Sequence, residues 1–229
     1  MLEGYLAHDE KYLLEESKKP AVIVVHEWKG LGDYAKRRAN QLAELGYVAF
    51  AIDMYGKDVR PQTHEEAAKV SGIYREDRNL MRARAHAALE RLKEVPIVDA
   101  GRIAAIGYCF GGSTVLEMAR AGEDLKGVVS FHGSLSTPMP AESGKVKSRI
   151  LVLHGAADTF ISATDVAGFK DEMTNSVADY KFIAYEGAVH SFTVKEAGDD
   201  PTKGMAYHEK ADKESWDEMK KFLAETIGV

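Results

Sequence analysis

Short apolar runs alternate with helical patterns along the 229 residues of this chain. Continuous apolar runs suit strands buried on both faces of a sheet, whereas apolar positions three and four residues apart suit helices packed on it. Strands joined by such helices form parallel sheets. The predicted strands span residues 21–25, 47–52, 102–107, 126–131, 149–154 and 180–185. The predicted helices span residues 34–45, 73–94 and 110–121, a segment opened by the capping-box pair Ser162 and Asp165, and residues 207–226.

No internal repeat or interdomain linker interrupts this alternation. We therefore expect one domain over residues 1–229, with a mostly parallel central sheet and helices on both faces. Residues 2–14 are expected to form a short hairpin at the sheet edge. The helix over 73–94 carries a row of arginines, for which a solvated face paired with acidic neighbours is favoured over an anion-binding role. These arginines are Arg75, Arg78, Arg82, Arg84 and Arg91, and the neighbours are Glu76, Asp77 and Glu90.

Composition narrows the possible classes of protein. The chain has 30 Lys and Arg against 36 Asp and Glu, a formal net charge of −6 that argues against a nucleic-acid partner. No apolar stretch reaches about 18 residues, and no signal-peptide pattern is found at the start, so a cytoplasmic protein without a membrane contact is expected. One cysteine excludes an internal disulfide and the Cys-rich zinc modules. We expect no metal and no organic cofactor.

The motif Gly107-Tyr108-Cys109-Phe110-Gly111 lies between a predicted strand and a predicted helix. It has the G-x-S-x-G spacing of a nucleophile elbow, with sulfur replacing the hydroxyl. Such a turn forces its central residue into a strained conformation, and residues two before and two after must be very small. The following helix presents free N–H groups to the sulfur and favours the thiolate. A buried core cysteine is the alternative, but the strand–turn–helix context favours a nucleophile.

A thiol nucleophile needs a base. In this architecture an acid and then a histidine follow the nucleophile, each beyond the end of a strand. Asp158 and His190 satisfy that order, so Asp158 is expected to orient the His190 imidazole, which activates Cys109. His132 and His154 are ranked well below His190 as the base.

A third candidate segment, His26-Glu27-Trp28-Lys29-Gly30, follows the first buried strand. It is not an HExxH zinc motif, because glycine stands where the second histidine is required. The backbone N–H groups of Trp28 and Phe110 are the expected oxyanion hole. Glu27 would place a carboxylate beside the thiol; the alternative is a strand-end residue paired with Lys29 or solvent.

Together these motifs resemble the dienelactone hydrolase family, and the resemblance extends over nearly the whole chain. It also includes Asp53-Met54-Tyr55-Gly56 and the segment Gly187-x-x-His190-Ser191-Phe192. The resemblance implies an α/β-hydrolase fold, a Cys109–Asp158–His190 triad, and Glu27 as the carboxylate that governs the thiol. From the same motifs, Tyr108, Ser191 and Phe192 are candidates for substrate binding.

The family's mechanism, by the same resemblance, implies a resting neutral thiol turned away from the histidine. An entering substrate lets the carboxylate take the thiol proton, and the thiolate swings to the histidine and attacks the ester. One departure concerns the substrate. An arginine is expected two residues after Phe192, where this chain has Val194. A second is expected ahead of the long helix, and neither Arg60 nor Arg75 matches it.

These observations predict a cysteine-dependent hydrolase of esters or lactones that acts through an acyl-enzyme. The expected partner is a small-molecule ester or lactone, and the chain is expected to be a monomer or a weak homo-oligomer. Alternatives are a thioesterase or peptidase on the same triad, a non-hydrolytic thiol redox sensor, and, least favoured, a pseudoenzyme that kept the scaffold.

Overall fold

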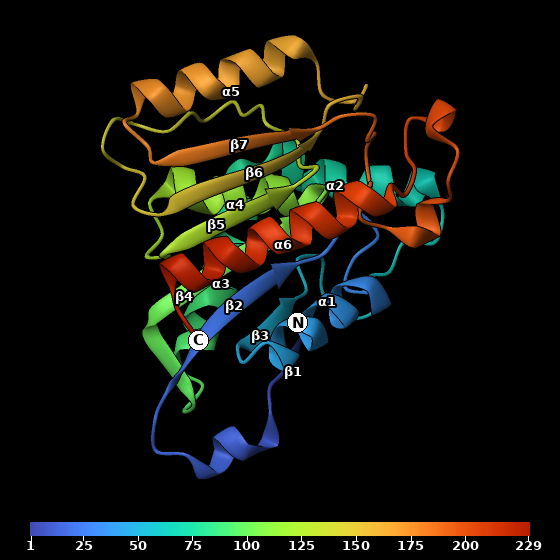
Figure 1. Cartoon of the computed structure of the whole chain (residues 1–229). Coiled ribbons are helices and arrows are strands. Elements are labelled where there is room, and N and C mark those ends of the chain that lie inside the picture. Colours follow the sequence, from blue (N-terminus) through green and yellow to red (C-terminus); the bar gives the residue numbers. More distant parts are fainter.

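The core of the molecule is a seven-stranded sheet in the order β1-β3-β2-β4-β5-β6-β7 (Figure 1). The computed structural model describes residues 1–229. All neighbouring strands are parallel except β1, which runs antiparallel to β3 at one edge. The strands are β1 (Gly4–Ala7), β2 (Lys19–Val25), β3 (Val48–Ile52), β4 (Val98–Tyr108), β5 (Gly127–Phe131), β6 (Arg149–Gly155) and β7 (Tyr180–Tyr185). The expected α/β-hydrolase fold with a mostly parallel sheet is confirmed.

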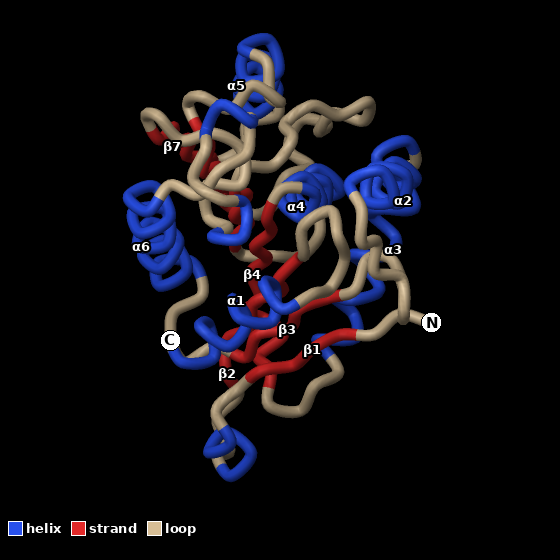
Figure 2. Tube along the Cα trace, turned by 90° about the vertical axis from the view of Figure 1, so that its right-hand side faces the viewer, coloured by secondary structure: helices blue, strands red, loops and turns tan.

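Helices cover both faces of this sheet. Apolar side chains of α1 and α6 pack on one face, and those of α2, α3, α4 and α5 pack on the other. Figure 2 shows the strands passing between α6 on one side and α3 and α4 on the other. The helices are α1 (Asp33–Glu44), α2 (His64–Glu76), α3 (Arg78–Lys93), α4 (Phe110–Ala121), α5 (Ala163–Asn175) and α6 (Glu209–Thr226), with short 3₁₀ helices η1 (Glu10–Leu14), η2 (Lys195–Ala197) and η3 (Pro201–Lys203).

The central strands are apolar on both faces because both faces are covered. In β2, residues 21–25 are completely buried. Side chains such as Leu42 in α1 and Leu89 in α3 are also completely buried, and each such side chain contributes about 1.5–3 kcal/mol through the hydrophobic effect. The capping box predicted at Ser162 and Asp165 opens α5. No helix has a stretch that is both long and apolar enough to span a bilayer.

Two predicted elements are wrong. The hairpin over residues 2–14 does not form, because β1 pairs with β3 and residues 10–14 make η1, which Asp9 caps. The helix over residues 73–94 is two helices separated at Asp77. The Asp77 carboxylate accepts a hydrogen bond from the Leu80 N–H and begins α3, while the Asp77 N–H ends α2 on the Ile73 carbonyl.

The parallel strands bring the candidate site together. Their carboxyl ends lie at one edge of the sheet, where the following loops meet. The loops after β2, β4, β6 and β7 carry Glu27, Cys109, Asp158 and His190, respectively.

Candidate active site

The turn from β4 into α4 holds Cys109 in a conformation that few side chains adopt, with φ 52° and ψ −111°. Two glycines make the turn possible. A Cβ on Gly107 would lie 2.1 Å from the Gly111 carbonyl oxygen, and a Cβ on Gly111 would lie 2.2 Å from the Val25 carbonyl oxygen. Both contacts are with backbone, which cannot swing aside. The motif therefore adopts the sharp turn that its spacing predicts.

The Cys109 side chain points at His190. The distance from Cys109 Sγ to His190 Nε2 is 3.1 Å, and His190 Nδ1 donates to Asp158 Oδ2 at 2.8 Å. The second Asp158 oxygen, Oδ1, accepts from the Phe160 N–H. All three triad side chains are at least nine-tenths buried. The structure thus brings together the three residues predicted as a triad. It does not contain the resting thiol turned away from the histidine that the family resemblance implies.

The electrostatics of this group favour a charged imidazole. Burial alone would lower the pKa of His190, but the adjacent Cys109 and the hydrogen bond to Asp158 together raise it above its ordinary value. The arrangement therefore favours a protonated His190 imidazole beside the Cys109 sulfur.

Glu27 lies in the loop that follows β2. Its Oε1 atom is buried without a hydrogen-bond partner. Burial raises the pKa of Glu27 to about 7, although His190 and Ser191 act in the opposite direction. Lys29, the alternative partner, donates instead to the Gln62 carbonyl. The Glu27 carboxyl can therefore change its protonation state near neutral pH.

The two N–H groups predicted as an oxyanion hole are both free of protein acceptors. Phe110 is the first residue of α4, so its N–H has no partner within the helix. The Trp28 N–H donates to no backbone or side-chain acceptor. The loop that contains Trp28 is held by His26. The His26 Nδ1–H donates to the Glu27 carbonyl, and His26 Nε2 accepts from the Met54 N–H. Burial lowers the pKa of His26 to about 4, so this bridging imidazole is neutral.

A cavity of about 300 Å³ opens above the Cys109 sulfur. Its lining is mostly apolar, and the Arg75 guanidinium lies at its wall. The lining residues are Trp28, Arg75, Cys109, Ser113, Ser134, Phe160, Ile161, His190 and Met205.

The three residues expected to bind substrate, Tyr108, Ser191 and Phe192, do not line this cavity. Alternation along β4 sends the Tyr108 ring to the opposite sheet face, where it packs against Tyr34 and Phe131. Phe192 is completely buried and packs against His132 and Tyr185. Ser191 turns toward Glu27 and lowers its pKa by hydrogen bonding.

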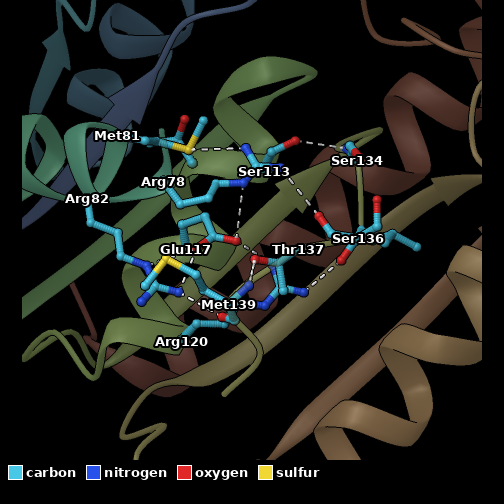
Figure 3. A network of polar contacts seen from close by, with 12 residues as sticks. Arg78, Met81, Arg82, Ser113, Glu117, Arg120, Ser134, Ser136, Thr137 and Met139 are labelled. Carbon is cyan, nitrogen blue, oxygen red and sulfur yellow. Dashed lines mark hydrogen bonds and ion pairs between the residues drawn. The ribbon is translucent and has the colours of Figure 1, made fainter. Parts of the chain in front are cut away.

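The prediction that the arginine row is a solvated face is wrong for Arg78 and Arg82. Both approach Glu117, a completely buried carboxylate in α4. Figure 3 shows this network, in which Arg120 also pairs with Glu117. The same arginines bind carbonyls of the loop after β5: Arg78 that of Ser136, Arg82 that of Met139 and Arg120 that of Leu135. The network therefore holds the loop after β5 in place, and this loop contributes Ser134 to the cavity wall.

Two further side chains near the sulfur, Arg75 and His132, were considered from the sequence but not assigned to the site. Arg75, in the last turn of α2, lines the cavity. His132 touches the nucleophile turn, with its Nδ1 3.1 Å from the Cys109 amide nitrogen. The position of His132 directly after a buried strand could have indicated a role at the site. In the sequence, however, His132 was compared with His190 only as a candidate base.

The sequence of this chain is similar to those of known proteins. The model of the dienelactone hydrolase family matches residues 2–227. An uncharacterized protein of Caenorhabditis elegans is 40% identical over 156 residues, which cover 66% of this chain and 98% of that protein.

Solved structures agree with the family match. A dienelactone hydrolase-like promiscuous phosphotriesterase from metagenomic libraries has a TM-score of 0.92 at 38% identity, covering 99% of this chain and 93% of that one. A dienelactone hydrolase from Anabaena variabilis has a TM-score of 0.61 at 21% identity, covering 82% of each chain. At that identity the likeness concerns the fold alone.

Proposed function

The chain belongs to the dienelactone hydrolase family of hydrolases acting on ester or lactone bonds, and we propose that Cys109 is its nucleophile. The observation that carries the proposal is the continuous contact from Cys109 Sγ through the His190 imidazole to the Asp158 carboxylate. Burial of all three side chains strengthens the electrostatic interactions among them. The substrate that we propose is a carboxylic ester or lactone.

In the proposed reaction, the Cys109 thiolate attacks the carbonyl carbon and forms a C–S bond. The carbonyl electron pair moves to the oxygen, which accepts hydrogen bonds from the Trp28 and Phe110 N–H groups. Collapse of this intermediate breaks the C–O bond, and the leaving alkoxide takes a proton from the His190 imidazolium. In a lactone the alcohol so formed remains on the same acyl chain.

Deacylation reverses these roles. A water molecule gives a proton to the now neutral His190 and attacks the thioester carbonyl. Breaking of the C–S bond releases the acid and restores the thiolate, while Asp158 holds the imidazole in the required tautomer. Each turnover therefore consumes one ester and one water without any redox change.

We test the proposal by intact-mass measurement on mixing the protein with p-nitrophenyl acetate. We expect a transient gain of one acetyl group, located by peptide mapping on Cys109, together with a burst of p-nitrophenolate. A peptidase or thioesterase would also acylate, and a panel of ester, thioester and amide substrates separates these activities by kcat/KM. Turnover without any acyl adduct on Cys109 would contradict the proposal, and a non-hydrolytic thiol sensor would give neither adduct nor turnover.

We further propose that Glu27 takes the proton from the Cys109 thiol and passes it to His190 before attack, which gives the thiolate and the imidazolium that the reaction needs. This role needs a carboxyl that is part protonated near neutral pH. The raised pKa of about 7 and the unpaired Oε1 atom support it.

Protonation of Glu27 can be measured through stability. Between its ordinary pKa and about 7, the folded protein holds a proton that the unfolded chain has lost, so this group makes stability fall as pH rises. Glu27→Gln removes that dependence. We expect the variant's free energy of unfolding to gain about 2 to 3 kcal/mol on the parent between pH 5 and pH 8, measured by urea denaturation. A difference that is constant with pH would show that Glu27 titrates normally.

A further inference from the structure

His132 connects the turn that carries Cys109 with the loop that carries His190. It lies directly after β5 and is completely buried. On one side its Nδ1 atom accepts from the Cys109 N–H, which is shared with the Phe131 carbonyl at 3.0 Å. On the other side its Nε2 atom lies 2.8 Å from the hydroxyl of Thr193, three residues beyond His190. One imidazole thus binds both the turn that carries the nucleophile and the loop that carries the base.

These contacts fix the protonation of His132. Because a backbone N–H can only donate, Nδ1 must be the unprotonated nitrogen, and Nε2–H donates to Thr193. Burial lowers the pKa of His132 well below its ordinary value, and the neighbouring His190 acts in the same direction. A neutral ring is therefore the form that fits between a donor and the His190 imidazolium.

The far end of this connection is itself anchored. The Thr193 hydroxyl is 2.7 Å from the Tyr34 hydroxyl, which also accepts from Arg38 Nε. Arg38 in turn pairs with Asp212 in α6. The ring of His132 also meets the His190 ring edge-on, with centroids 5.4 Å apart. Both ring nitrogens of His132 therefore have a partner, and the Thr193 partner is itself held by side chains of α1 and, through Arg38, of α6.

We propose that His132 is a positioning residue, a neutral brace that sets the alignment of Cys109 Sγ with His190 Nε2. The His132 side chain does not line the cavity, and in this proposal it takes no part in proton transfer. The proposal rests on the role of Cys109 given above. Because misalignment of reacting groups lowers the rate of chemistry more than it weakens binding, loss of the brace should reduce kcat and leave KM almost unchanged.

Three variants test the brace. His132→Phe keeps a ring but removes both polar contacts. His132→Asn retains an acceptor for the Cys109 N–H and tolerates the local φ of 39°. Thr193→Val leaves His132 in place and removes its hydroxyl partner. Leu42→Ala, a completely buried site in α1, supplies a matched loss of stability away from the site.

The readouts are kcat, KM and the rate at which iodoacetamide alkylates Cys109, the single cysteine of the chain. We expect His132→Phe to lower kcat about 100-fold with KM within about twofold, and His132→Asn to recover about 10-fold of that loss. Thr193→Val should lower kcat about 10-fold and add nothing in the double variant with His132→Phe. Alkylation rates should fall in the same order.

The brace is refuted if His132→Phe and His132→Asn lose activity equally, or if both behave like Leu42→Ala at the same stability. A rise in KM without loss of kcat would also overturn it. Should His132→Phe fail to fold, His132→Asn and Thr193→Val still decide. Failure of the proposed function would give a different result. Cys109→Ala would then retain turnover, and alkylation of Cys109 in the parent protein would not change its activity.

Discussion

Cys109→Ala is expected to lower kcat for an activated ester such as p-nitrophenyl acetate by about 10,000-fold or more. The substitution removes the sulfur that lies 3.1 Å from His190 Nε2 and leaves no other nucleophile in that position. The free N–H groups of Trp28 and Phe110 remain, so a small residual rate above the uncatalysed reaction is expected. The loss should appear in kcat because the substituted atom reacts only after the substrate has bound.

The measurement is steady-state kinetics with protein checked for folding by circular dichroism and thermal unfolding. Ser17→Ala, an exposed substitution far from the cavity, is the control and should leave kcat unchanged. Turnover by Cys109→Ala at the parental rate would refute the nucleophile, whichever substrate is used.

Gly107→Ala should destabilise the fold by about 4 kcal/mol or more, which places it among the most damaging single substitutions. The new methyl group would lie 2.1 Å from the Gly111 carbonyl oxygen and 2.2 Å from its carbonyl carbon. Relief requires moving β4 away from α4 at the point where both are completely buried. Any protein that still folds should have lost the Cys109 turn and most of its activity.

Gly72→Ala in α2 is the matched control. A Cβ at Gly72 meets no atom within 4 Å, so the same change should stabilise the helix by about 0.5 to 1 kcal/mol. Urea denaturation of both variants measures the two effects. Similar stabilities for the two proteins would show that the elbow tolerates a side chain and would undermine its predicted geometry.

Sequence patterns identified the framework because buried strands and amphipathic helices leave local signals. The strands at 21–25 and 180–185 lie within or match the observed elements, since continuous β-branched and aromatic runs suit a covered sheet. The long helix was misjudged at Asp77, because apolar spacing continues from Tyr74 to Met81 although the axis breaks. An aspartate that caps a helix looks, in one sequence, like any surface residue.

The residues of the candidate site were also predicted only in part. Spacing in the chain located Cys109, Asp158 and His190, and the structure brings them together. Spacing failed for Tyr108, because adjacency to the nucleophile says nothing of which sheet face a side chain occupies. It also failed for the arginines, since their buried partner Glu117 lies on another helix, 35 residues beyond Arg82.

By itself, the sequence determined most of the alternating strands and helices, the elbow around Cys109 and the family resemblance, because each is encoded in neighbouring residues. Only the tertiary structure decided that His132 braces the site, that Arg75 reaches the cavity and that Arg78 and Arg82 pair with the buried Glu117. The physical reason is that hydrogen bonds and ion pairs depend on which distant segments pack together. Residue spacing along one chain carries no record of those contacts.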